Sequence, residues 1–538
     1  MLKWMFLLCV VFTAVASAQP AITPNGIVNA ASYAPVGVPN SSIAQGSIFS
    51  IFGTAMGPAS SPLLQWPLQK TLGGVSVQIQ PASGAVQQAI LLYVGPTQIN
   101  AILPSATAVG AATATVTYGG QTSAPASFTV VKSSFGVFSL NTEGNGPGAV
   151  LNYVQNQSWP INTLVTTATP GQTVILWGTG LGPVSGDETQ PPVQGDLRSG
   201  LDQVTLWVGG QQVPIAYAGR STSAGQDQIN FVAPNIPGCY VPVMLQIGSV
   251  VSNTITISIG PSGGVCQDSS MPAGLNAAKV ESNGLKVASL ELWQATVHAL
   301  INGSYVDAPT QGIYAYFYAA DPLFVLLNQG GVDTYGACSV STIGATAAPV
   351  LGTATYLNAG APMTLAGPSG APLTLTQPIL IPVGDYSAYL SQLTAGSYTV
   401  KGPGGSDVGS FNAALTLPAP FTWNSLSGIT QVDRSQGVTF NWTGGSGDVV
   451  LYGTSYVLVG RTLVGAQFGC LAKASDGQLT VPPYVLAALP ASQTVNGQMQ
   501  GYLTFVNTAA TTNFSATGLD VGIFYAYYQY STSAITFN

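Results

Sequence analysis

The sequence predicts an all-β protein built from tandem β-sandwich domains, and three observations lead to this prediction. Short runs of alternating apolar and polar residues recur along the 538-residue chain, as expected for strands with one buried face. Turn-forming residues are frequent, with 64 Gly and 37 Pro, and they separate these runs. No amphipathic pattern of 12 or more residues interrupts the runs of the first half, so no long helix is expected there.

The chain begins with the features of a secretory signal peptide. Lys3 supplies a positive charge, residues 4–14 form an apolar stretch, and Ala-Ser-Ala at 16–18 provides a small-residue cleavage site. The apolar stretch is too short to span a bilayer, and no later run of about 20 apolar residues occurs. We therefore expect residues 1–18 to be cleaved off, and the mature chain to be extracellular or at the cell surface without a transmembrane segment.

The composition excludes several classes of function. Charged residues make up 5% of the chain, with 11 Lys and Arg, 18 Asp and Glu, and one His. Eleven basic side chains over this length cannot form the clustered footprint that nucleic-acid binding needs. Acid–base, hydrolytic and metal chemistry rely mostly on His and carboxylates, which are scarce here. We expect a non-enzymatic protein that binds no nucleic acid and needs no cofactor.

An internal repeat organises the first half of the chain. The segment 46–58, G-S-I-F-S-I-F-G-T-A-M-G-P, returns at 171–183 as G-Q-T-V-I-L-W-G-T-G-L-G-P. A second motif, Gln-Ile-Asn, stands at 98–100 and again at 228–230, with a proline four residues after each copy. Two ordered matches at offsets of 125 and 130 residues predict two copies of one module.

Each copy consists of short alternating runs that we interpret as strands with one buried and one solvated face. The glycines after each first motif permit the sharp chain reversal that ends a strand. The G-x-G-x-G spacing at 178–182 differs from that of a nucleotide-binding loop. The runs lie at 75–79, 114–118 and 127–131 in the first copy, and at 204–208, 241–247 and 254–259 in the second.

The repeated motif resembles that of the IPT/TIG class of immunoglobulin-like domains. The paired form, with residues 96–101 and 227–231, is similar to tandem modules at the C-terminal ends of a secreted protein family of acidobacterial type. The resemblance covers residues 25 to 262 and implies tandem immunoglobulin-like β-sandwiches without assigned catalytic residues. TIG modules elsewhere serve in adhesion proteins, receptors, glycan-active enzymes and transcription factors. The signal peptide and the scarcity of basic residues disfavour the last of these.

Four cysteines remain in the mature chain, because Cys9 lies in the signal segment. An even number in an oxidising compartment indicates disulfides, for which Cys239, Cys266, Cys338 and Cys470 allow three pairings. Zinc is disfavoured, since no Cys-x-x-Cys pair occurs and the chain has one His. In the related modules a Gly-Cys before the penultimate strand pairs with a Cys after the last one, which implies a Cys239–Cys266 bridge. A Cys338–Cys470 bridge would then clamp two later domains together.

Beyond a Pro-Ser-Gly-Gly linker at 261–264, the second half of the chain also consists of short β-like runs. Pro-Ala-Pro at 418–420 marks a soft boundary, and a single larger β unit over 263–538 is the alternative to two domains. The predicted runs are 289–293, 313–318, 397–401, 411–417, 438–442, 449–452, 503–506 and 523–530. The predicted organisation is therefore a signal peptide at 1–18 followed by β domains at 19–133, 134–262, 263–420 and 421–538.

The densest charge on the chain follows Pro183. Asp187, Glu188, Asp196 and Asp202 fall within 16 residues there. Calcium needs several carboxylate oxygens, so this loop is the candidate metal site of the sequence. Because the spacing matches no D-x-D-x-D pattern, we favour a solvated loop on an otherwise neutral surface.

A serine hydrolase site is not expected. Residues 260–264 match G-x-S-x-G, but they lie in a linker rather than in a turn between a strand and a helix. His298, which would have to act as the base, lies in an apolar strand-like run.

The aromatic run Phe524–Tyr530 allows a functional interpretation beside the ordinary one of a half-buried strand, which we favour. Alternation would place one set of its rings in the core and leave the other set on the surface, where tyrosines stack on sugars or on protein partners. We therefore predict a secreted protein for cell-surface binding or adhesion, whose partner is an extracellular polysaccharide or a surface protein. A carbohydrate-binding accessory protein and a structural spacer are the alternatives.

Overall fold

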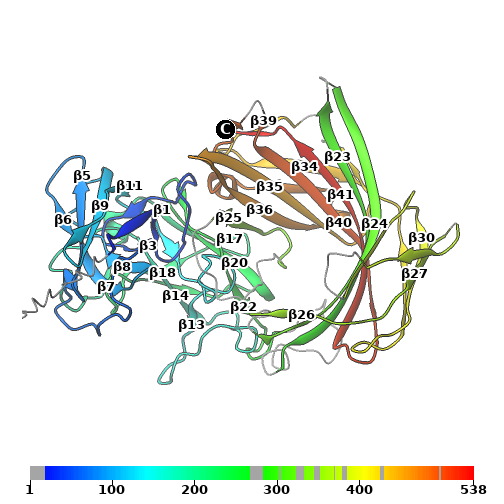
Figure 1. Cartoon of the computed structure of the whole chain (residues 1–538), viewed down its shortest axis with the longest axis horizontal. Coiled ribbons are helices and arrows are strands. Elements are labelled where there is room, and N and C mark those ends of the chain that lie inside the picture. Colours follow the sequence, from blue (N-terminus) through cyan, green and yellow to red (C-terminus); the bar gives the residue numbers. More distant parts are fainter. Residues whose placement is uncertain are drawn as a thin grey trace, which may run out of the picture.

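The computed structural model describes residues 18–266, 283–301, 304–322, 333–344, 352–368, 370–377, 384–424, 429–495 and 498–538. Residues 1–17 of the predicted signal peptide lie outside this set. The described chain is all-β, with two small sandwiches followed by a larger unit of long strands (Figure 1). Among the described residues, no helix combines the length and the apolar character needed to cross a membrane.

The first module is a sandwich of two sheets (Figure 1). One sheet has the strand order β1-β3-β8-β7, with bounds Ala21–Asn29, Ile48–Thr54, Gln98–Ile102 and Ile90–Val94. The other has the order β2-β11-β9-β5-β4, with bounds Ile43–Ala44, Ala126–Val131, Gly110–Tyr118, Val75–Pro81 and Thr71–Leu72; β6 (Gln87–Gln88) and β10 (Gln121–Thr122) extend it. Buried side chains from both sheets form its core, among them Phe49, Ile51, Val77 and Ile99.

The second module repeats this design. Its first sheet has the order β12-β14-β19-β18-β15, with bounds Gly136–Val137, Thr173–Thr179, Asp227–Val232, Ile215–Arg220 and Gly195–Asp196; β13 (Val150–Asn152) pairs with β14. Its second sheet has the order β17-β16-β20-β21, with bounds Gln211–Val213, Val204–Val208, Gly238–Ile247 and Val250–Val251; β22 (Ile255–Ile259) pairs with β20. The two modules have separate cores.

The repeated motifs lie on neighbouring strands in both modules. The first motif forms β3 and β14, and the Gln-Ile-Asn motif lies in β8 and β19, which pair with them antiparallel. In both copies the Gln amide donates to the Asn side chain two residues on, at 2.9 Å from Gln98 to Asn100 and 2.8 Å from Gln228 to Asn230. The prediction of tandem immunoglobulin-like modules is confirmed at the level of fold.

The larger unit is built on a nine-stranded sheet (Figure 1). Its order is β25-β36-β35-β40-β41-β23-β24-β26, and β29 also pairs with β24. The bounds are, in that order, Cys338–Ile343, Thr462–Lys473, Asp448–Val459, Gly501–Phe514, Val521–Ser533, Leu285–Ile301, Ser304–Ala320, Ala354–Tyr356 and, for β29, Asp385–Tyr389. Strands from both sides of residue 421 therefore lie in one sheet. Several are much longer than the runs identified in the sequence, and β23 and β24 have 17 residues each.

Smaller elements cover one face of this sheet. The sheet β28-β27-β30-β31 (Leu373–Leu375, Met363–Ala366, Gly396–Gly402 and Phe411–Leu417) lies beside it (Figure 1). The remaining elements are β32 (Thr422–Trp423), β33 (Gln431–Val432), β34 (Val438–Thr443), β37 (Gln478–Val481), α3 (Pro483–Ala487), β38 (Thr494–Val495), β39 (Gln498–Met499) and β42 (Thr536–Phe537). Aromatic side chains such as Phe440, Phe505 and Phe524 fill the core between the layers.

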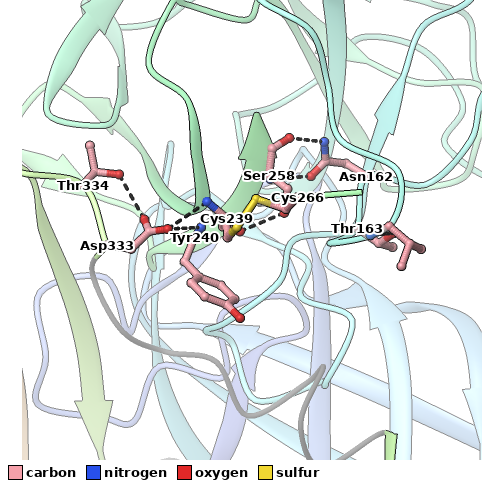
Figure 2. The surroundings of a disulfide bond; sticks show 9 residues. Asn162, Thr163, Cys239, Tyr240, Ser258, Cys266, Asp333 and Thr334 are labelled. Carbon is pink, nitrogen blue, oxygen red and sulfur yellow. Dashed lines mark hydrogen bonds between the residues drawn. A yellow bond between two sulfur atoms is a disulfide. The ribbon is translucent and has the colours of Figure 1, made fainter. Parts of the chain in front are cut away.

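Both disulfides join segments that the strand pairing brings together. Cys239 of β20 bonds Cys266 just after β22, as the resemblance to related modules implied (Figure 2). Cys338 bonds Cys470, its direct neighbour across the β25–β36 pair. The second bridge was expected to clamp two consecutive domains. It lies within a single sheet instead, because β25 and β36 are adjacent strands.

The three parts of the chain contact one another. The Asp333 carboxylate accepts hydrogen bonds from the backbone N–H groups of Cys239 and Tyr240, at 2.8 and 2.9 Å (Figure 2). Trp207 of the second module stacks on Tyr484 of the larger unit, with ring centroids 4.1 Å apart. The first module contacts the larger unit at Gly37, which lies against Val457, Val459 and Val464. The chain is therefore folded back on itself rather than extended.

Candidate functional site

The four carboxylates of the predicted acidic loop have separate partners. Asp187 accepts hydrogen bonds from the backbone and hydroxyl of Thr189, and these hydrogen bonds lower its pKa. Asp196 forms an ion pair with Arg198, whose hydrogen bonds lower the pKa of that carboxyl. Asp202 lies beside Gly248, at the turn after β20. In the part of the chain that the structure describes, no three His, Cys, Asp or Glu side chains are placed to hold a metal ion together.

Glu188, the fourth carboxylate, joins the two modules. Its two oxygens accept hydrogen bonds from the backbone N–H and the hydroxyl of Ser105, at 2.7 and 2.9 Å. The loop that carries Glu188 lines a pocket of about 260 Å³ together with Ile102 of the first module and Arg220 of the second. No local sequence signal predicts that this acidic loop holds the two modules together.

A buried ion pair lies at the same junction. Arg220 and Asp227, on neighbouring strands β18 and β19, approach to 3.0 Å with side chains that are 5% and 0% exposed. The second oxygen of Asp227 accepts the backbone N–H groups of Gly180 and Leu181, both at 2.8 Å. Burial raises the pKa of Asp227, and Arg220 and the two N–H groups oppose that shift. The pair fixes the glycine-rich turn that follows β14.

The residues of the G-x-S-x-G match and His298 lie in ordinary turn and strand positions. Ser262 lies in a turn after β22, and Gly263 and Gly264 both have positive φ. His298 lies in β23 opposite Asp307 of β24, with 2.7 Å between its Nδ1 and the carboxylate.

The aromatic run in β41 has two different faces. Phe524 and Tyr528 are buried in the core, and the Tyr528 hydroxyl donates to the carbonyl of Pro418 at 2.9 Å. Tyr525 and Tyr527 alternate with them and therefore lie on the opposite face of the sheet. That face is the candidate binding surface of the molecule.

Neighbouring strands add further rings to this face. Leu290 and Leu292 of β23 are buried in the core, so the residues between and after them lie on the opposite face with Tyr525 and Tyr527. The registers place Glu291 opposite both Tyr314 of β24 and Tyr525 of β41. We call the following residues of β23, β24, β29 and β41 the aromatic face: Ser289, Glu291, Trp293, Tyr314, Tyr316, Asp385, Tyr389, Tyr525 and Tyr527.

The rings of the aromatic face lie close together. Trp293 and Tyr314 are stacked at 5.4 Å between centroids with 13° between their planes, and Tyr389 meets Trp293 edge-on at 6.1 Å. Along the strands, Tyr314 and Tyr316 are 5.8 Å apart and Tyr525 and Tyr527 are 6.0 Å apart. Neighbours along β24 and β41 and the cross-strand pair Trp293–Tyr314 thus have ring planes that differ by 13–27° and centroids at similar spacings.

The aromatic face has a negative electrostatic character. Burial and then the charge of Glu291 raise the pKa of Tyr527 to about 12. Burial and then Asp385 and Glu291 raise the pKa of Tyr316. These tyrosines are therefore neutral hydrogen-bond donors at physiological pH, and the charge on the face comes from the two carboxylates.

One end of the aromatic face adjoins a pocket. Tyr389, which is 72% exposed, lines a pocket of about 260 Å³ with Gln392, Thr394 and Tyr398. The Tyr398 hydroxyl is held in place, since it donates to the carbonyl of Thr394 and accepts from its N–H. The exposed ring of Tyr389 and the polar pocket beside it together provide a stacking surface and hydrogen-bonding groups for a ligand.

Sequence reasoning identified the tyrosines of β41 but missed the other members of the face. Tyr314 and Tyr316 alternate with smaller or buried residues at a period of two, and that signal was present in the sequence. No comparable alternation in the sequence marks Glu291, Trp293 or Asp385. They join the face only because strands far apart in sequence are neighbours in the sheet.

No protein-family model and no curated protein matches the chain. Among solved structures, the chain is similar to a tetra-tandem repeat from the extending region of a large adhesion protein, at 12% identity over 96% of this chain and 99% of that chain, with a TM-score of 0.13. It is also similar to domains 5 and 6 of the S-layer protein SbsC, at 15% identity over 45% and 98%, with a TM-score of 0.18. A third is SGBP-B of the Bacteroides ovatus mixed-linkage glucan utilization locus, in complex with a mixed-linkage heptasaccharide, at 10% identity over 87% and 96%, with a TM-score of 0.13. At such low scores, no conclusion about this chain rests on these similarities.

Proposed function

We propose that this protein is a non-enzymatic extracellular binding protein that holds a polysaccharide on the aromatic face of its nine-stranded sheet. The observation that carries the proposal is the row of parallel rings formed by Trp293, Tyr314 and Tyr316, bordered by Tyr389. Aromatic rings present a flat apolar surface with a polar edge, which suits the apolar faces and hydroxyl groups of sugars.

The polar groups of the face support a glycan ligand. The indole N–H of Trp293 has no acceptor among the described residues, although the side chain is only 7% exposed. An unsatisfied buried donor costs about 1–3 kcal/mol. The nitrogen itself is covered in the structure, so the donors that a sugar can reach on this face are tyrosine hydroxyls such as that of Tyr389, which is 72% exposed. The protonated tyrosines add further donors along the face.

Two disulfides support the extracellular location. Cys239–Cys266 and Cys338–Cys470 are both formed in the structure, and such bonds persist in oxidising compartments. The signal segment expected from the sequence accords with this location. Retention at the cell surface and a role in adhesion are part of the same proposal.

The contacts between the three parts favour a binding role over that of a structural spacer. A spacer gains reach from modules arranged end to end. Here the first module lies against the larger unit at Gly37, and the second module packs against it through Trp207. The chain therefore reaches less far than three parts arranged end to end would, and the two modules are fixed against the larger unit.

Replacing Tyr389 tests the proposal. The mature chain is titrated calorimetrically against soluble oligosaccharides from a panel of extracellular polysaccharides. We expect a saturable ligand whose affinity falls about tenfold or more in Tyr389→Ala, because an exposed aromatic ring that stacks on a ligand next to a polar pocket contributes on this scale. The variant should keep the wild-type melting temperature, since the ring is 72% exposed.

The matched control is Tyr93→Ala in the first module, whose ring is 42% exposed and lies outside the aromatic face. Its affinity should equal that of the wild type. Equal losses in both variants, or no saturable binding to any glycan, would contradict the proposed function.

A further inference from the structure

We propose that the polysaccharide bound by the aromatic face carries protonated amino groups, which Glu291 and Asp385 recognise in concert with the surrounding rings. This inference rests on the proposed function and names the chemical class of its ligand. It is carried by a buried carboxylate without a partner and by the arrangement of rings around a second carboxylate.

Asp385 is the first of the two carboxylates. Its side chain is 8% exposed, and it lies in β29 directly opposite Tyr316. The next residue, Tyr386, is buried in the core, so Asp385 belongs to the opposite face of the sheet. Among the described residues none forms a hydrogen bond or an ion pair with its carboxylate, whose oxygens keep some contact with solvent. Burial raises the pKa of this carboxyl, and a cation bound beside it would stabilise its charged form.

Glu291 occupies the centre of the aromatic face. It lies directly opposite Tyr314 on one side and Tyr525 on the other, with Trp293 two residues along the same strand. Directly opposed side chains in a sheet have Cβ atoms about 4.5–5.5 Å apart. Ser289 donates a hydrogen bond to one Glu291 oxygen at 3.1 Å. A cation over Glu291 would therefore touch a carboxylate and aromatic rings at once.

The combination of rings and carboxylates selects for cations. Aromatic faces attract ammonium groups through the ring quadrupole, most strongly where water is partly excluded. The nine residues of the aromatic face include two carboxylates and no Lys or Arg. A neutral sugar can use the rings alone, whereas an amino sugar can use both features.

The spacing of the rings favours a polymer of sugars over a single small cation. Successive rings along β24 and β41 are 5.8 and 6.0 Å apart, comparable to the length of one pyranose unit. A chain of amino sugars could place consecutive units on consecutive rings. A lysine-rich peptide shares the charge but not the flat rings that stack on aromatic side chains, and it serves as a competitor in the test.

The test compares three hexasaccharides with the same β-1,4 linkage, built from glucosamine, N-acetylglucosamine and glucose. Calorimetric titrations use the mature chain. We expect the glucosamine hexamer to bind at least tenfold more tightly than the other two. Raising the salt concentration from 50 to 500 mM should weaken only the glucosamine hexamer, because salt screens its ionic attraction.

Charge-neutral variants identify the residues responsible. Asp385→Asn and Glu291→Gln keep the side-chain shapes, and each should weaken binding of the glucosamine hexamer several-fold more than binding of the glucose hexamer, so that the preference for the charged sugar falls. The matched control is Asp433→Asn, which removes an exposed carboxylate outside the aromatic face and should change neither affinity. Thermal melts of each variant check that the fold is retained.

The possible outcomes separate the two proposals. Equal affinity for all three hexamers, reduced by Tyr389→Ala, would overturn the cationic ligand and leave the proposed function standing. A hexalysine peptide that bound more tightly than the glucosamine hexamer would overturn the glycan class. Failure of every sugar to bind would overturn the proposed function and this inference with it.

Discussion

Two Arg–Asp pairs in the second module show how burial decides what an ion pair contributes. Arg198 and Asp196 are 39% and 38% exposed, whereas Arg220 and Asp227 are 5% and 0% exposed. In the exposed pair, water and salt screen the attraction and the net contribution is small. In the buried pair, each charge depends on the other, because neither can regain water in the folded state.

Removing one carboxylate from each pair should therefore give very different results. We expect Asp227→Ala to lower the free energy of unfolding by about 3–5 kcal/mol, since it leaves the Arg220 guanidinium buried without a counter-charge. Asp196→Ala should lower it by less than about 1 kcal/mol. Urea unfolding of both variants measures the difference, and similar small values for the two would contradict this account.

Single residues also show where sequence reasoning stops. The acidic loop was recognisable as a concentration of charge, but nothing in it indicated that Glu188 would bind Ser105 across a module junction. Likewise Asp385 reads as an ordinary surface residue, and only the fold around β29 buries it. Contacts between residues that only the tertiary structure brings together cannot be predicted from the local sequence.

Among the elements, β25 is held by a covalent bond as well as by strand pairing. It is the edge strand of the nine-stranded sheet and pairs only with β36 among the described strands. Cys338 and Cys470 join these two strands and close a loop of 132 residues. In the chain-entropy model, a loop of that length contributes about 5 kcal/mol to stability.

Replacing Cys338 and Cys470 together by Ser should therefore destabilise the larger unit by about 5 kcal/mol and loosen β25. Hydrogen exchange should increase first over residues 338–343. The comparison is the Cys239→Ser, Cys266→Ser double variant, whose loop of 27 residues is worth roughly 3–4 kcal/mol in the same model. Unchanged protection of β25 in the first variant would show that the strand is held by pairing alone.

The strands were predictable as elements, but their lengths and partners were not. Alternation identified Ser289–Trp293 and Ile313–Tyr318, which lie inside β23 and β24. The far end of this hairpin was recognised only on one strand, because His298 lies in a strand-like run whereas residues 306–310 include Pro309, which argues against a strand. The pairing of β23 with β41 joins segments more than 200 residues apart, and a local pattern carries no information about such a partner.

At the scale of the whole molecule, Gly37 lies at a close contact between the first module and the larger unit. Gly37 has φ +112°, and a Cβ there would come within 2.8–3.0 Å of side-chain atoms of Val457, Val459 and Val464. Only a residue without a side chain allows the first module to lie this close to the larger unit.

Gly37→Ala should consequently separate the first module from the larger unit. Gly110→Ala is the matched control, since Gly110 has φ +122° and no atom within 4 Å of an added Cβ. Both variants incur the backbone strain of Ala at positive φ, about 1 kcal/mol or more. Only Gly37→Ala should increase the radius of gyration measured by small-angle X-ray scattering, and identical scattering from the two variants would contradict the expectation.

The pairing of the first and last long strands of the larger unit sets the order in which the parts of the protein can fold. β23 pairs in parallel with β41, and the backbone N–H of Lys286 is bonded to Asp520, 234 residues further along the chain. The two modules can fold as soon as each has emerged from the ribosome or the export channel, because their partners are close in sequence. The large sheet cannot form until nearly the whole chain has been synthesised, and strand pairings at such sequence separations form slowly. During that interval the tyrosine-rich strands are exposed, so synthesis and export of this protein depend on keeping them apart from other chains until the last strand arrives.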